Sequence, residues 1–225
     1  MCAFHHSPQI VSTGLALLLD AKNPKSYPGS GASMFDLSGN SNNCSFSTAG
    51  IGTSIPGQLT FNGTSEYCTV GNSDSINLDD SMSAFAFIKP DDTSGRQNII
   101  TKAYQTSYGG YAMAINGSNL SFRRNPTTGS YNYVEKTAGI STTNWQSVAV
   151  TYGTAGAEFY KNGANIGTDT GYDLIQISNG LVIGKYASST YYFDGGIAYI
   201  LIYNRILTPA EVLQNHNALK GRFGL

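Results

Sequence analysis

The sequence predicts an all-β sandwich, and three observations carry that prediction. Of the 225 residues 40% are hydrophobic but only 12% are charged, against roughly 25% charged in an ordinary soluble domain. Twenty-six Gly mark frequent turns, and fifteen Tyr and ten Phe favour strands. Apolar and polar residues alternate with a period of two along many short segments, which is the pattern of half-buried strands. Turn signals recur about every ten residues with no alternating helices, as expected of a β-sandwich.

The expected strands fall on these alternating segments. Residues 84–88, 111–115 and 148–152 each place large apolar side chains at every second position. Asn116-Gly117 and Asn162-Gly163 are predicted hairpin turns, because both residue types tolerate positive φ.

The segment from Ile197 to Tyr203 is apolar at every position and predicts a strand buried on both faces. The predicted core is Leu17, Leu19, Phe61, Phe85, Phe87, Ile100, Met113, Ile115, Trp145, Val148, Val150, Phe159, Ile183, Ile200 and Ile202.

One short C-terminal helix is predicted at about residues 209–219. Thr208 is placed as its N-cap, Pro209 occupies the first helical position, and Glu211 closes a capping box with Thr208. Gly221 is expected to stop it.

The length suits one domain, and no linker or shift in composition divides the chain. We expect the folded domain to span residues 12–225 and to include the C-terminal helix. Residues 1–11 precede it as an N-terminal arm that is too short to fold alone.

Charge excludes several classes of partner. The 13 basic and 14 acidic residues are scattered and give a net charge of −1, and the one adjacent basic pair is Arg123-Arg124. Nucleic-acid binders carry a basic stripe, so no nucleic acid is expected. No apolar run approaches the ~20 residues of a membrane span, and the N-terminus lacks the pattern of a secretory signal. We therefore expect no membrane partner and synthesis in a cytoplasm.

The three cysteines, Cys2, Cys44 and Cys68, are odd in number and lack zinc-site spacing. The prediction is that they form neither a disulfide framework nor a metal cluster, and that Cys68 is a small buried hydrophobe.

Catalysis is also not expected. Glycoside hydrolases of β-sandwich folds need two facing carboxylates, but none of the four Glu residues has a second acid within two positions. The pairs Asp79-Asp80 and Asp91-Asp92 stand in turn-like contexts, where Asp caps bends. No nucleophile elbow, phosphate-binding loop or zinc-protease motif occurs. The sequence therefore predicts that the protein is not an enzyme.

Several segments, in order, resemble laminin G-like, concanavalin A-like jelly-roll domains. The matching segments are 18–31, 36–40, 61–67, 87–90, 145–150, 159–163 and 193–207. The resemblance spans about residues 12–225 and implies a concanavalin A-like β-sandwich of jelly-roll order.

Some members of this family bind calcium, but this sequence lacks two of the carboxylate residues that many members carry. Ala198 and Tyr199 stand where many members have Asp-Glu. Asn62, Glu66 and Asp194 are the remaining candidate ligands, fewer than calcium requires. Asn62 is expected to cap a turn, and no cofactor or metal is expected.

The segments 197–205 and 214–225 most resemble the version of this domain found in tailed-bacteriophage virion proteins. That resemblance implies a structural virion protein, a capsid-decoration, fibre or tail-associated subunit that contacts other virion proteins or copies of itself. Its expected location is the virion. The predicted assembly contacts lie in the arm, at Cys2, Phe4, His5, His6 and Pro8.

The alternative function is a carbohydrate-binding, lectin-like module for host-surface glycans. The aromatic rings that stack on the sugar would come from two loop-to-strand regions, which contain Tyr104, Tyr108, Tyr111, Tyr131 and Tyr133. Alternating tyrosines also occur simply as sandwich packing. Both functions stay open at the level of sequence.

Overall fold

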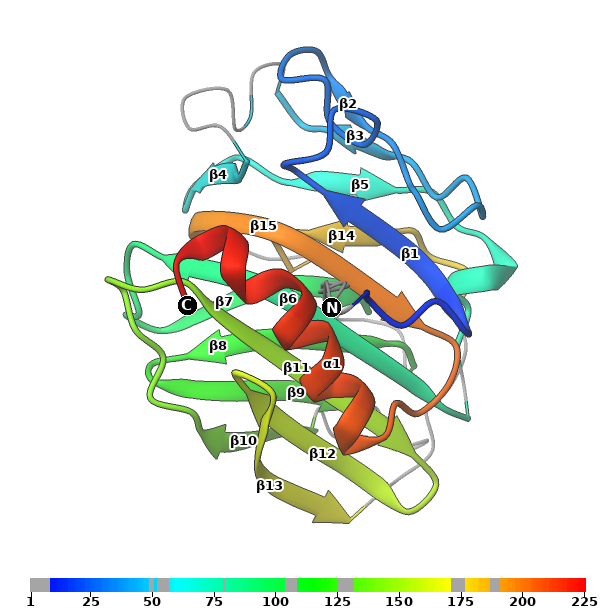
Figure 1. Ribbon diagram of the computed structural model, residues 1–225, viewed down its shortest axis with the longest axis vertical. Helices are drawn as coiled ribbons and strands as arrows, with labels where there is room; N and C mark the ends of the chain where they lie inside the picture. Colours follow the sequence, from blue (N-terminus) through cyan, green and yellow to red (C-terminus); the bar gives the residue numbers. More distant parts are fainter. Residues whose placement is uncertain are drawn as a thin grey trace, which may run out of the picture.

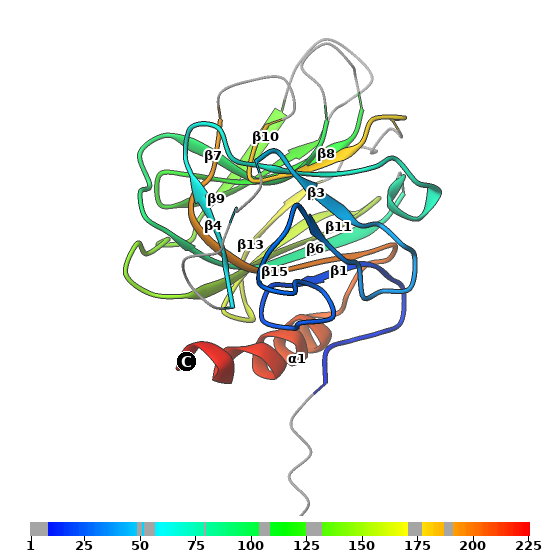
Figure 2. The same cartoon turned by 90° about the horizontal axis from the view of Figure 1, so that it is seen from above.

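The computed structural model describes residues 9–48, 51, 57–78, 80–103, 109–124, 132–170, 177–186 and 191–225. Over these residues the chain forms two antiparallel sheets packed face to face, and a C-terminal helix lies on the outside of one of them (Figure 1; Figure 2). The predicted all-β sandwich with one short C-terminal helix is confirmed.

One sheet has seven strands, and its longest strand, β15, pairs with three others. The first part of β15 pairs with β4, its second part pairs with β1 on the same side, and β6 lies along its other side. In spatial order the strands are β1 (Leu15–Asp20), β15 (Asp194–Tyr203), β6 (Met82–Pro90), β11 (Gln146–Gly153), β12 (Gly156–Lys161) and β13 (Ala164–Thr170), with β4 (Leu59–Asn62) beside β1.

The other sheet has eight strands and carries shorter elements toward one edge. In spatial order they are β10 (Asn132–Thr137), β9 (Asn119–Arg124), β8 (Tyr111–Asn116), β7 (Arg96–Lys102), β14 (Leu181–Ile183), β5 (Cys68–Val70), β3 (Cys44–Phe46) and β2 (Ser33–Met34). Single 3₁₀ turns occupy Asp74–Ile76 and Gly221–Phe223.

Two hairpins test the predicted turns. Asn162 and Gly163 connect β12 and β13 with φ of 50° and 79°, as predicted for Asn-Gly. In the β8–β9 hairpin the turn lies one residue later than predicted. Asn116 pairs with Asn119, so the turn residues are Gly117 and Ser118.

The apolar side chains form two layers. One layer fills the space between the sheets, and the other lies between the seven-stranded sheet and the helix. Strand β15 contributes to both, which confirms the prediction that it is buried on both faces. Fourteen of the fifteen predicted core residues are buried. The exception is Trp145, which precedes β11, is only partly buried and packs against Phe223 with ring centroids 4.7 Å apart.

The helix α1 (Pro209–Lys220) begins as the sequence predicts. The Thr208 side chain accepts from the Glu211 amide, the Glu211 carboxylate accepts from the Thr208 amide, and Pro209 occupies the first turn. Its end differs from the prediction. Gly221 keeps right-handed helical geometry and continues into the 3₁₀ turn, and the left-handed residue is Gly224, at φ 73°.

The described end of the predicted arm lies along α1. The Gln9 carbonyl accepts from Gln214, and the Val11 amide donates to Asn215 Oδ1 at 2.8 Å. The proposed contact residues Cys2, Phe4, His5, His6 and Pro8 lie outside the described residues, so their role stays a prediction.

The prediction of unpaired cysteines is wrong for two of the three. A disulfide joins Cys44 on β3 to Cys68 on β5. These strands are antiparallel neighbours, and both cysteines point into the layer between the sheets with their Cα atoms 5.8 Å apart. The sequence did not reveal this pair because 24 residues separate them and only the strand register brings them together.

Replacing both Cys44 and Cys68 by Ala should lower the free energy of unfolding by about 3–4 kcal/mol, because the bridge closes a loop of this length in the unfolded chain. Denaturant unfolding measures the difference. A reducing agent should destabilise the parent to a similar extent and leave the double variant unchanged. Equal stability of oxidised parent, reduced parent and variant would contradict the bridge.

Phe87 tests the layer beneath the helix. Its ring stacks on Phe223 at 4.8 Å and on the His216 imidazole at 6.0 Å between centroids. Phe87→Ala should lower the free energy of unfolding by about 3–5 kcal/mol. The control is Leu213→Ala, which truncates a 45% exposed side chain on the same helix and should cost about 1 kcal/mol or less. Equal losses in the two variants would contradict this packing.

Candidate functional site

The outer faces of the two sheets differ in what covers them. Helix α1 packs on the outside of the seven-stranded sheet, and the eight-stranded sheet lies on the opposite side of the molecule (Figure 2). On β8 and β9, Met113 and Phe122 face the layer between the sheets. Alternation therefore turns Ala112, Ala114 and Arg123 to the outer face. This face is the candidate site.

Five residues gather on it and are called here the tyrosine–arginine face: Arg96, Arg123, Tyr133, Tyr186 and Tyr191. The Arg96 guanidinium carbon lies 3.6 Å from the Tyr133 ring centroid, a close cation–π contact. The Arg123 guanidinium carbon lies 5.2 Å from the Tyr186 ring and 5.9 Å from the Tyr133 ring. Tyr186 meets Tyr191 edge to face at 6.4 Å. The two cations thus interleave with three aromatic rings.

Neighbouring polar side chains anchor this arrangement. Arg96 Nη2 pairs with Glu135 Oε1 at 3.2 Å, and Glu135 also accepts from Asn116 at 2.8 Å and Asn119 at 3.3 Å. Burial by itself raises the pKa of Glu135, but these three hydrogen bonds and the Arg96 charge outweigh it and lower the pKa. Glu135 therefore holds Arg96 in place as a carboxylate.

The side chains of this face differ widely in their exposure to solvent. Arg123 is 1% exposed, whereas Tyr191 is 43% exposed. Asn98 Oδ1, Ser121 Oγ and Tyr186 Oη are buried and have no hydrogen-bond partner in the part of the chain that the structure describes. Buried polar atoms are normally paired, so these three atoms retain unused hydrogen-bonding capacity within the described residues.

A second aromatic–cation cluster lies at the rim. Lys185 Nζ is 4.3 Å from the Tyr67 ring centroid and 5.3 Å from that of Tyr192, and the two rings lie 6.4 Å apart. Lys185 precedes Tyr186 and Tyr192 follows Tyr191, so this second cluster neighbours the tyrosine–arginine face along the chain.

The tyrosines predicted as ligand-binding residues separate in the structure. Tyr104, Tyr108 and Tyr131 lie outside the described residues. Tyr111 is buried between the sheets, where its hydroxyl donates to the Ile76 carbonyl at 3.2 Å, so it presents no surface to a ligand. It shares the inward side of β8 with the core. Tyr133 lies on the tyrosine–arginine face.

Sequence reasoning missed four members of this face, Arg96, Arg123, Tyr186 and Tyr191. A signal existed for Arg123, because alternation with Phe122 places it on the outer side of a strand. Arg96 reaches the face through the pairing of β7 with β8, where it lies opposite Asn116.

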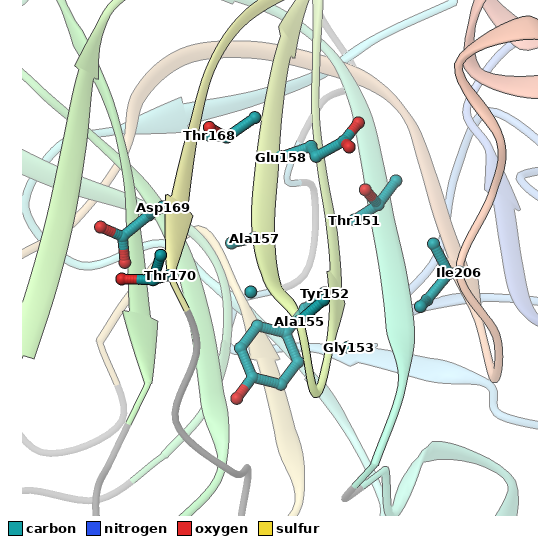
Figure 3. A pocket seen from close by; sticks show the side chains of 11 residues that line it. Thr151, Tyr152, Gly153, Ala155, Ala157, Glu158, Thr168, Asp169, Thr170 and Ile206 are labelled. Atoms are coloured by element: carbon teal, nitrogen blue, oxygen red, sulfur yellow. The ribbon is translucent and has the colours of Figure 1, made fainter.

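A hollow of about 290 Å³ lies elsewhere, at the end of β11–β13, and contains two carboxylates (Figure 3). Glu158 pairs in register with Thr168, and Ala157 pairs with Asp169, so the two acids project to opposite faces of the sheet. Glu158 accepts from the Tyr160 hydroxyl and from Asn165. Figure 3 shows Glu158 and Asp169 pointing apart, so this hollow does not hold the facing pair that glycoside hydrolysis needs.

The predicted calcium candidates serve as turn residues where the structure shows their bonds. Asn62 Oδ1 accepts from the amides of Thr64, Ser65 and Glu66, which confirms its predicted capping role. Asp92 similarly accepts from the Ser94 amide. Among the described residues, no three His, Cys, Asp or Glu side chains are grouped to hold a metal ion.

Fold and sequence together define the class of the protein as a concanavalin A-like jelly roll. A family profile, Laminin_G_3, described as the concanavalin A-like lectin/glucanases superfamily, matches residues 62–213, and the chain belongs to this family. No curated protein matches its sequence. Within the described ranges, no helix is both long and apolar enough to cross a membrane.

Solved structures share the fold at low identity. Domain 4 of AbnA, an arabinanase from Geobacillus stearothermophilus solved with arabinotriose, has a TM-score of 0.70 and 16% identity over 90% of this chain and 98% of its own. The binding domain of Paraclostridial Mosquitocidal Protein 1 has a TM-score of 0.69 and 17% identity over 92% of this chain and 52% of its own, so this chain spans about half its length.

A third similar structure is a module of a sialidase. The Ruminococcus gnavus IT-sialidase CBM40, bound to alpha2,3 sialyllactose, has a TM-score of 0.56 and 13% identity over 69% of this chain and 94% of its own. Of these three structures, two are parts of glycosidases and one is the binding domain of a protein named for its mosquitocidal action. At these identities the likeness establishes the fold of this chain.

Glu135→Gln tests the anchoring of Arg96. Because the folded state lowers the pKa of Glu135 from 4.5, the carboxylate adds stability that is present above about pH 4.5 and is lost as the pH falls through the lower folded-state pKa. The parent should therefore be more stable than the variant near neutral pH, and the difference should shrink in acid. Urea unfolding across this range, with Glu66→Gln as control, measures it. A difference independent of pH would contradict the anchoring role.

Proposed function

We propose that this protein is a carbohydrate-binding module and that the tyrosine–arginine face binds the glycan. The observation that carries the proposal is the contact of two arginines with three tyrosine rings on the sheet face opposite α1. Binding sites of this kind combine apolar and aromatic surface with a few fixed polar groups.

The chemistry of the face suits a sugar. A pyranose or furanose ring offers C–H surface that packs on an aromatic ring and hydroxyls that need donors and acceptors. Tyrosine supplies a rigid ring with a polar tip. Arg96 supplies guanidinium donors beside the Tyr133 ring. Tyr191, 43% exposed, is the ring best placed to meet a ligand from solvent.

The comparisons support the proposal at the level of the fold. AbnA domain 4 was solved with arabinotriose, and the sialidase module with sialyllactose. Each is one part of a glycosidase and was solved with a bound oligosaccharide. A binding role also agrees with the opposed directions of Glu158 and Asp169 in the hollow beside β13.

The virion role implied by the sequence resemblance stays a prediction, as does location in a phage particle. The two functions are compatible, because jelly rolls serve both as viral capsid domains and as lectins. A subunit that displays a glycan-binding face on a particle would combine them.

A glycan array followed by calorimetry tests the proposal. Tyr191→Ala and Tyr133→Ala should each weaken the best-bound glycan about tenfold or more, because each removes a stacking ring. The matched control is Phe35→Ala, which truncates an aromatic side chain of similar exposure, 47%, after β2 at the other edge of the same sheet.

Thermal melting confirms that each variant is folded before binding is compared. Absence of binding across the array, or binding that both tyrosine variants leave unchanged, would overturn the proposal.

A further inference from the structure

We infer that the glycan bound by the tyrosine–arginine face is acidic and that its carboxylate is held at Arg96. This inference rests on the proposed function and adds the chemical class of the ligand. It depends on the charge of the face, the donors of Arg96 and the way the surrounding residues hold its guanidinium group.

The charges on and beside this face are mainly positive. Arg96, Arg123 and Lys185 contribute three cations among the described residues, and Glu135 contributes a carboxylate within hydrogen-bond distance of Arg96. Burial raises the pKa of the Tyr133 hydroxyl, and the charges that act against this rise are those of Arg123 and Arg96. The hydroxyl therefore sits in a positive field.

Besides Glu135, three further carboxylates lie near the start of β7. Asp91, Asp92 and Asp194 lie beyond the start of β7, where the Asp194 amide bonds to Gln97 and the Asp91 amide bonds to the Asp194 carbonyl. These three carboxylates act on one another, since burial and then Asp91 and Asp92 raise the pKa of Asp194. A neutral ligand would gain little from this separation of charge, whereas an anion is drawn to the arginines.

The guanidinium of Arg96 is only partly used. Glu135 accepts a hydrogen bond from Nη2. Nε is buried and has no hydrogen-bond partner within the described ranges, so the remaining guanidinium N–H groups are the donors offered to a ligand. A guanidinium carries five N–H donors in a planar fork that fits the two oxygens of a carboxylate. The Tyr133 ring, 3.6 Å away, fixes the plane of that fork. The same fork also pairs with two oxygens of a phosphate or sulfate group, so sulfated and phosphorylated sugars are the competing ligands against which a carboxylate is tested.

Acidic sugars with this group come from two sources, the sialic acids and the uronic acids. Calorimetry with sialyllactose against lactose covers the first source. Trigalacturonate against its methyl ester tests the second source, with a pair that differs only in whether the carboxylates are free or esterified. We expect at least one acidic member to bind about tenfold or more tightly than its neutral partner, and the preference to fall as salt is raised.

Arg96→Gln should remove most of that preference, and Arg96→Lys should keep only part of it, because the ammonium retains the charge but not the fork. The matched control is Arg222→Gln. Arg222 also pairs with a carboxylate, Asp20 at 3.0 Å, and also lies over a tyrosine ring, Tyr199 at 5.4 Å, but on the helix side of the molecule. The control should leave the preference unchanged.

The outcomes separate the two proposals. Equal binding of acidic and neutral partners that Tyr191→Ala abolishes would overturn the inference and keep the glycan-binding function. A preference for sulfated or phosphorylated sugars over carboxylated ones, or an acidic preference that Arg96→Gln leaves intact in a folded variant, would also overturn the inference. Binding to none of the glycans would overturn both.

Discussion

The arrangement of this protein depends on one constraint, the burial of the seven-stranded sheet on both faces. Strands β6, β11 and β15 carry apolar side chains on each side, so one face needs a second sheet and the other needs a cover. The capping box at Thr208 starts α1 where it can supply that cover, and Val212 and Leu219 are its buried residues. The eight-stranded sheet differs on its outer face. Small and polar side chains such as Ala112, Ala114 and Ser121 are buried there beside the tyrosine–arginine face, which is the candidate site.

Local signals predicted those parts of the fold that local chemistry determines. Thr208, Pro209 and Glu211 define the start of α1 because the cap needs residues only three positions apart. Asn162 and Gly163 define their turn because both residues accept positive φ. Pairings between distant segments were out of reach. Cys44 and Cys68 meet only because β3 and β5 are neighbours, and Trp145 packs on a C-terminal Phe223 that the helix end positions. Such contacts depend on which strands become neighbours. The alternation of apolar and polar residues along a strand does not predict that.

The candidate site shows the same division. The side of β9 on which Arg123 lies follows from its alternation with the buried Phe122. The same rule turns Tyr111 inward, and it shows that a cluster of tyrosines in sequence is not a cluster on a surface. Arg96 and Tyr186 reach Tyr133 and Arg123 from segments separated by up to ninety positions, through the pairing of β7 with β8 and of β14 with β7. The sequence therefore shows each of the arginines and tyrosines of this face, but it does not predict that they lie next to one another.

Arg96 stacks on the Tyr133 ring and pairs with Glu135, and this arrangement affects the rates of ligand binding and release. A free arginine on a surface samples many rotamers, and immobilising such a side chain on binding costs about 0.5–1.5 kcal/mol. Here the ring and the carboxylate have fixed the guanidinium before any ligand arrives. Little ordering is left for the encounter with a ligand. Discrimination among ligands that fit this preset geometry is then expressed mainly in how long each one stays bound, rather than in how fast it arrives.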